Sequence, residues 1–186
     1  MKRFICVILA LSCFSIVTAA GKFNFTWALG SSATFYGDEA FVTTFNGLKD
    51  RGYKNIVLSG ELGMRVIFMD NVAFCLNGVI SMDTLTLITS NHFFFDYGIS
   101  GGVKIYPGLA GFNFGIEYIT GRRSDVMDDV ETVSTSWGNG FRLLLEYEFE
   151  NLIKSFSPSL GVAWRRMPRG NDVADNILSF YVRAPF

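Results

Sequence analysis

From residue 22 to the end of the chain, apolar and polar side chains alternate with a period of two. In the first such segment Phe23, Phe25 and Trp27 fall on one side, and the residues between them are small or polar. A period of two is typical of a β-strand whose two faces meet different surroundings. Eight segments share this pattern, spanning residues 23–30, 56–68, 72–82, 95–105, 112–118, 141–149, 156–165 and 178–186. We therefore expect an all-β fold.

The apolar faces of these segments carry more aromatic side chains than strands facing water usually do. Of the 186 residues, 49% are hydrophobic and 19 are Phe, and the mean hydropathy is +0.30. After residue 20 no apolar run is long enough for a membrane-spanning helix, and a closed barrel is the other fold that pairs all backbone polar groups in lipid. A soluble sandwich would carry many Lys and Glu on its wet face. We predict an eight-stranded antiparallel up-and-down transmembrane β-barrel over residues 21–186.

The first 20 residues have the layout of an export signal. Lys2 and Arg3 form the positive start, residues 4–11 the apolar centre, and residues 17–20 a small-residue cleavage site. An alternative hypothesis uses Cys13 as a lipid-attachment site, although Ala10 stands where such sites usually have Leu. Loss of residues 1–20 leaves Cys75 as the single cysteine, which cannot form an internal disulfide. It also leaves 14 basic against 17 acidic residues, so we expect no nucleic-acid partner.

The polar connectors between the segments alternate in length. Those at 69–71, 106–108 and 150–155 are short, and those at 37–53, 83–91, 120–136 and 167–175 are longer. Transmembrane barrels place short turns on the periplasmic side and long loops outside. We therefore expect both termini in the periplasm and the long loops outside the cell.

The stretch Asp83–Phe94 breaks the alternation. Residues 84–87 shift its phase, and the three Phe residues at 93–95 interrupt it. A β-bulge or an outward-flaring loop would absorb such a slip. The strand boundaries in this stretch stay open.

With the small-residue faces turned inward, ten charged side chains point into the barrel. The five acids are Glu61, Asp96, Glu117, Glu146 and Glu148, and the five bases are Arg65, Lys104, Arg142, Arg165 and Arg183. Charges removed from bulk water need partners, and equal numbers allow every charge to be paired. These pairs either plug the lumen or form a conducting or switching network.

The last segment resembles the assembly signal of bacterial outer-membrane β-barrels. Leu178, Phe180, Val182 and Ala184 alternate up to the terminal Phe186, and Ala184 stands where an aromatic residue is common. Taken with the leader and the eight segments, the chain resembles the small eight-stranded barrels: the transmembrane domain of outer membrane protein A, and outer membrane proteins X and W. The resemblance implies a monomer in the outer membrane, in contact with its lipids, whose last strand is recognised by the barrel-assembly machinery.

The charged lumen also resembles one member of this group. Glu61, Lys104 and Glu146, on the second, fourth and sixth segments, are placed similarly to the ion-pair gate of the A-type barrel. That family has an arginine midway along the seventh strand. Here Gly161 occupies that place, and Arg165 lies nearer the outer end.

Two functions are compatible with such a barrel. The first is membrane structure or surface interaction, because residues 122–125 and 128–131 put charges of both signs on one predicted loop, where they could contact lipopolysaccharide phosphates, host protein or divalent ions. The alternative is a small channel for hydrophobic or small polar solutes, as the W-type resemblance implies, which needs an apolar trough in the lumen or a lateral opening.

A third hypothesis is a lipid A acyltransferase or deacylase. Such an enzyme needs a histidine hydrogen-bonded to a serine nucleophile. His92 is the single histidine of the chain, and Ser90 is the serine that would share its strand face. We expect the protein not to be an enzyme and to need no cofactor or metal.

Overall fold

A computed structural model describes residues 22–87, 90–109, 111–127, 132–149, 157–170 and 173–185. Eight long strands dominate this part of the chain: β1 (Lys22–Phe35), β2 (Lys54–Met69), β3 (Val72–Leu87), β4 (Ser90–Ile105), β5 (Phe112–Met127), β7 (Gly138–Glu148), β8 (Ser159–Gly170) and β9 (Val173–Pro185). The helix α2 (Glu39–Asp50) follows β1, and the two-residue strand β6 (Val133–Ser134) pairs with β5. None of the described helices is long and apolar enough to cross a membrane.

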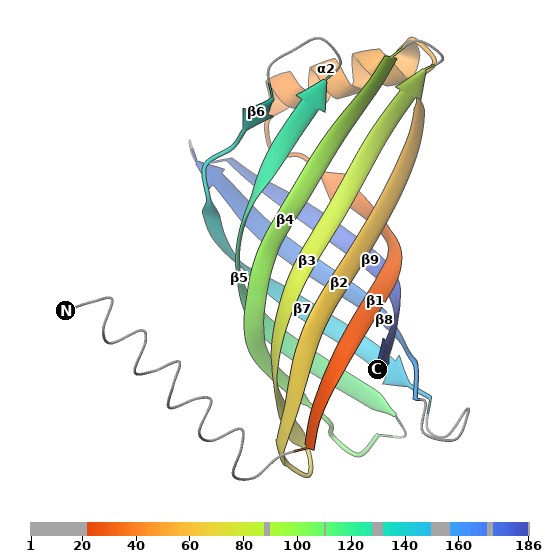
Figure 1. Ribbon diagram of the computed structural model, residues 1–186. Helices are drawn as coiled ribbons and strands as arrows, with labels where there is room; N and C mark the ends of the chain where they lie inside the picture. Colours follow the sequence, from red (N-terminus) through yellow and green to blue (C-terminus); the bar gives the residue numbers. More distant parts are fainter. Residues whose placement is uncertain are drawn as a thin grey trace, which may run out of the picture.

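The long strands close into a barrel. Their hydrogen-bonded order is β4-β3-β2-β1-β9-β8-β7-β5, and a further pairing of β4 with β5 completes the ring. Every one of these pairings is antiparallel. α2 lies across one end of the barrel, and the turn between β2 and β3 lies at the other end (Figure 1). The prediction of an eight-stranded antiparallel up-and-down barrel is confirmed. The predicted leader and the terminal Phe186 lie outside the described residues.

The alternation along each strand separates an apolar outer wall from a polar lumen. Large hydrophobic side chains are exposed on every long strand, and they include Phe25, Leu62, Leu76, Ile99, Ile116, Leu143, Leu160 and Phe180. The residues between them, including Asn77, Ser100, Asn113 and Ser159, are buried. An exposed apolar wall of this extent is stable where it faces lipid rather than water.

The strands at the α2 end are longer than the sequence indicated. The prediction of long loops at 83–91 and 167–175 is wrong. β3 pairs with β4 as far as Leu87, which lies opposite Ser90. β8 pairs with β9 as far as Gly170, which lies opposite Val173. Part of the expected loop 120–136 is also strand, because β5 continues to Met127. Polar side chains on these extensions gave them the composition of loops, while their backbones complete the sheet.

The phase shift near Asp83 has its cause in α2. The β3–β4 register runs without a break, so the bulge considered for this stretch is absent. Instead, Leu85 and Phe94 point inward and pack against Phe45 of the helix, with Phe41 beside them. Asp38 caps the N-terminus of the helix, because its side chain accepts hydrogen bonds from the backbone N–H groups of Ala40 and Phe41. The inward face therefore becomes apolar where α2 covers it.

Two of the pairings stop short of the α2 end. β1 leaves β2 after Gly30, which lies opposite Ser59, and β5 leaves β7 after Gly121, which lies opposite Gly138. Beyond these points β2, β3, β4 and β5 continue together as a sheet that rises above the other strands (Figure 1). The barrel is therefore closed in its lower part, and towards α2 it is split between β1 and β2 and between β5 and β7.

Candidate functional site

The ten charged side chains expected in the lumen all lie there in ion pairs with one another. The pairs are Arg65–Glu148 (3.3 Å), Lys104–Glu146 (2.6 Å), Arg142–Glu61, Arg142–Glu117 (3.0 Å), Arg165–Asp96 (3.0 Å), Arg183–Glu61 (2.6 Å) and Arg183–Glu146 (2.9 Å). The most accessible of these side chains, Glu148, is 22% exposed. Within this set, five positive charges neutralise five negative ones.

The middle of the lumen is built around Arg142 and Glu117, which face each other on β7 and β5. Nη1 of Arg142 lies 3.0 Å from Glu117, and its Nη2 donates to Glu61 on β2. Glu117 also accepts hydrogen bonds from Asn77 at 2.9 Å and from Ser100 at 2.6 Å. One guanidinium thus joins carboxylates from opposite sides of the barrel, which fills the lumen at this level.

Glu146 is the second centre of the network. It accepts from Lys104 Nζ at 2.6 Å, from Arg183 Nε at 2.9 Å and from the Tyr181 hydroxyl at 2.7 Å. The Tyr181 ring lies over Gly161, where a Cβ would come within 2.5 Å of the ring. The absence of a side chain at Gly161 therefore leaves room for the Tyr181 ring, and Arg183 on β9 supplies a positive charge to Glu146.

A third ionic cluster lies at the end of the lumen opposite α2. Nη1 of Arg65 donates to the Tyr106 hydroxyl at 2.6 Å and lies 3.3 Å from Glu148. Burial raises the pKa of Tyr106, and the nearby Arg65 opposes that shift in part. Because the phenol stays protonated, it bonds Arg65 as a neutral acceptor and leaves the charge of Glu148 to balance the arginine.

Towards α2 the network continues through residues outside the predicted set. Asp96 lies between Arg165 and Arg169, and Nε of Arg169 donates to Asp175 at 2.8 Å. Asp175 also accepts from Arg123 Nη1 at 3.0 Å. These ion pairs form an upper cluster that runs from Arg165 through Asp96, Arg169 and Asp175 to Arg123 at the mouth of the lumen.

The upper cluster of charges also holds α2 in place. The Arg123 guanidinium lies 4.0 Å from the centroid of the Phe41 ring in the helix, a cation–π distance. Tyr36, which precedes the helix, donates its hydroxyl proton to Asp83. Burial raises the pKa of Tyr36, and the Asp83 carboxylate raises it further, so this donor persists across the physiological pH range. The helix is thus attached to the mouth by apolar, cation–π and hydrogen-bonding contacts.

Sequence reasoning missed four residues of the upper network: Arg123, Asp125, Arg169 and Asp175. They lie in stretches that were assigned to loops. The signal that could have found them is the alternation itself, because Arg123 and Asp125 continue the inward positions of β5 and Arg169 continues those of β8. Residues 122–125 therefore do not form the charged loop that was expected, and residues 128–131 lie outside the described residues.

His92 and Cys75, the two side chains considered for chemical reactivity, both lie on strands of the barrel. His92 lies in β4 with its ring 5.4 Å from that of Tyr53, and its Nδ1 is buried without a hydrogen-bond partner among the described residues. Cys75 is a partly buried free thiol on β3. Within the described ranges, no group of three or more His, Cys, Asp or Glu side chains could hold a metal ion.

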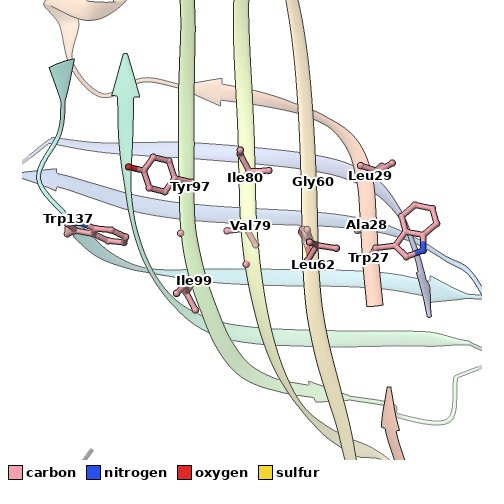
Figure 2. Close-up of a pocket in the computed structure, with 13 residues that line it drawn as sticks. Trp27, Ala28, Leu29, Gly60, Leu62, Val79, Ile80, Tyr97, Ile99 and Trp137 are labelled. Carbon is pink, nitrogen blue, oxygen red and sulfur yellow. The ribbon is translucent and has the colours of Figure 1, made fainter. Parts of the chain in front are cut away.

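The outer wall carries a hollow of about 880 Å³ across β1 to β4. Leu29, Leu62, Ile80 and Ile99 border it, and Trp27 stands at its β1 edge (Figure 2). A second hollow of about 500 Å³ shares Leu62, Gly78 and Ile99 with the first. We call the two together the wall groove. Its lining is almost entirely apolar, and the upper part adjoins Gly30, where β1 separates from β2.

The side chains of the last strand divide between the outer wall and its seams. Phe180 and Val182 are exposed, Leu178 is half-buried, and Ala184 is buried opposite Trp27 of β1. A larger residue at position 184 would compete with Trp27 for this space. The assembly-signal role of these residues stays a prediction.

Two solved structures show how this fold compares with known ones. Ail, the attachment invasion locus protein of Yersinia pestis, matches with a TM-score of 0.57 and 11% identity over 90% of this chain and 99% of Ail. Neisserial surface protein A matches with a TM-score of 0.55 and 10% identity over 88% of this chain and 97% of that protein. No protein-family model matches the chain, and no curated protein matches it. The fold is that of the small eight-stranded outer-membrane barrels, as the resemblance of the sequence implied.

Proposed function

We propose that this protein is an integral outer-membrane barrel with a closed lumen, whose α2 end faces the outside of the cell and takes part in surface interactions. The observation that carries the proposal is the ionic network, which occupies the lumen at three levels and continues to a mouth covered by α2. Buried guanidinium–carboxylate pairs of this kind leave few unpaired charges to attract a hydrated ion. The apolar outer wall supports the membrane location.

The conductance of the purified protein in planar bilayers tests the closed lumen. We expect almost no steady current, because an ion would have to displace paired side chains. A large, steady, salt-dependent current in the wild type would overturn this part of the proposal and favour a working pore.

The surface role is supported by a group of exposed bases at the end of α2. Lys49, Arg51 and Lys54 are exposed, and none of them has an ion-pair partner among the described residues. One structure of Ail holds that protein in complex with the heparin analogue sucrose octasulfate. We infer that the three bases of this chain attract sulfated or phosphorylated polyanions outside the cell.

Calorimetric titration with sucrose octasulfate, at two salt concentrations, measures this attraction. We expect weak binding that falls with salt and that is lost when all three bases are replaced by Gln. The exposed Arg166, on β8, provides a control, because Arg166→Gln removes one positive charge far from α2 in sequence. Binding that survives the triple substitution would contradict the assignment of these bases.

A channel for hydrophobic solutes is the second candidate function, and the split between β1 and β2 favours it. Above Gly30 and Ser59 these strands are no longer paired, and the wall groove begins beside this point. A disulfide between cysteines at positions 31 and 58 would lock the split, because both positions face outward and lie opposite each other when the register of Gly30 with Ser59 is continued by one residue. Uptake of a hydrophobic solute by vesicles that stops on oxidation and returns on reduction would support this function.

A further inference from the structure

The wall groove has the properties of a site for one specific lipid, in addition to the general contact with lipid that the outer wall makes. We propose that it binds a phosphorylated lipid with several acyl chains, the chemistry of lipid A, with the chains in the groove and a phosphate against Arg122. The proposal rests on the proposed orientation, which places the α2 end of the wall in the outer leaflet.

Two outward-facing glycines form the floor of the groove, although the fold does not require them. A Cβ at Gly78 would meet nothing nearer than 3.8 Å, and one at Gly60 would have only ordinary contacts of 3.4 Å or more. Glycine inside a strand is unfavourable because it loses more conformational entropy on folding than other residues do, and because it has no side chain to pack. By contrast, a Cβ at Gly161 would collide with the Tyr181 ring. The glycines at 60 and 78 therefore keep space open on the outer wall.

The size of the groove favours a lipid with more than one chain. Its lining runs from Trp27 and Leu29 on β1 to Tyr97 and Ile99 on β4 (Figure 2). Neighbouring strands lie about 4.8 Å apart, so the groove is about 14 Å wide from β1 to β4. The second hollow extends it past Gly78 towards Phe25. A single acyl chain would leave most of this width unfilled.

A positive charge stands at the β5 side of the groove. Arg122 lies directly opposite Tyr97 in the β4–β5 register, and both side chains belong to the outer face. Nε of Arg122 is buried without a hydrogen-bond partner, and no described carboxylate forms an ion pair with this residue. Trp137, whose ring packs edge-on against Tyr97 at 6.2 Å, borders the same corner.

A guanidinium that has no carboxylate partner within the described ranges, beside an apolar groove, favours an anionic headgroup. Arginine binds phosphate through paired N–H donors, and aromatic side chains such as Tyr97 and Trp137 favour the level where acyl chains meet headgroups. A second copy of this chain would present the same positive charge at its own groove. Charge complementarity therefore favours the phosphorylated lipid over a dimer.

Native mass spectrometry of the detergent-solubilised protein, titrated separately with lipid A, phosphatidylglycerol and phosphatidylcholine, tests the proposal. We expect one lipid A to bind with preference over both phospholipids. Gly78→Leu, which fills the floor, and Arg122→Gln, which removes the charge, should each weaken binding by about tenfold or more. Val162→Leu and Arg166→Gln are the matched controls on β8, and both should bind as the wild type does.

Several results would overturn the inference. Equal affinity for phosphatidylglycerol would show a general anionic-lipid surface, and wild-type affinity in Gly78→Leu would place the lipid elsewhere. A dimer that Gly78→Leu dissolves would assign the groove to a second copy. Gel mobility without boiling checks that each variant is folded, and Gly78→Ala provides a milder test of the floor. None of these measurements depends on conductance or on polyanion binding, so failure here is distinct from failure of the proposed function.

Discussion

Arg142 is the side chain whose removal tests the lumen network most directly. It is 2% exposed and pairs with both Glu61 and Glu117. In Arg142→Met, Glu61 keeps Arg183 at 2.6 Å, whereas Glu117 keeps only the hydrogen bonds of neutral groups. The substitution therefore leaves one buried carboxylate without a positively charged partner.

The expected loss of stability follows from this unpaired negative charge. Breaking a buried ion pair by removing one partner costs about 3–5 kcal/mol of stability. Lys104→Met should cost less, about 1–3 kcal/mol, because Glu146 keeps Arg183 at 2.9 Å and the Tyr181 hydroxyl at 2.7 Å. Water entering beside Glu117 relieves part of the penalty, so conductance should rise in Arg142→Met as stability falls.

Urea unfolding in detergent micelles, followed by tryptophan fluorescence and by gel mobility of unboiled samples, gives these free energies. The control is the double variant Arg142→Met with Glu117→Gln, which removes one charge of each sign and should be more stable than Arg142→Met alone. If Arg142→Met loses under about 1 kcal/mol, or if the double variant is the less stable, the carboxylate is not held by this pairing and the argument for an ionic plug is refuted.

Further outcomes follow from other contacts. Phe45→Ala removes the packing of α2 on the mouth, so hydrogen exchange of the helix amides should accelerate while barrel unfolding changes little. Tyr181→Phe should cost about 1–3 kcal/mol in urea unfolding, because a buried carboxylate loses a donor. In a Cys75→Ala background, an impermeant thiol reagent on whole cells should label Asn46→Cys and spare Asp70→Cys; the opposite result would reverse the orientation. Unboiled protein should migrate differently from boiled protein, because a closed barrel has no free edge at which to unfold.

The strand faces could be predicted from sequence because they depend on local alternation. Leu62 and Glu61 are neighbours in the chain and necessarily point to opposite sides of β2. Once the small-residue face of each strand is assigned to the lumen, the apolar outer wall and the inward set of ten charges both follow. The fold class follows as well, since a bilayer admits only closed barrels and helices.

The upper end of the barrel could not be predicted in the same way. Polar strands that extend beyond a membrane have the composition of loops, so Arg123 and Asp175 were assigned to connectors. α2 was also missed, although its effect on the sequence is visible in the apolar inward residues Leu85 and Phe94. Those residues break the alternation because they face a helix that lies across the mouth.

The sequence alone thus determined the kind of barrel, the side of each strand that faces lipid, and the charges enclosed. The partners of those charges required the folded structure. Arg183 meets Glu61 across 122 residues of chain, and Arg142 meets Glu61 across 81. Alternation is a property of neighbouring residues, whereas these contacts depend on the register of strands that are brought together only when the ring closes.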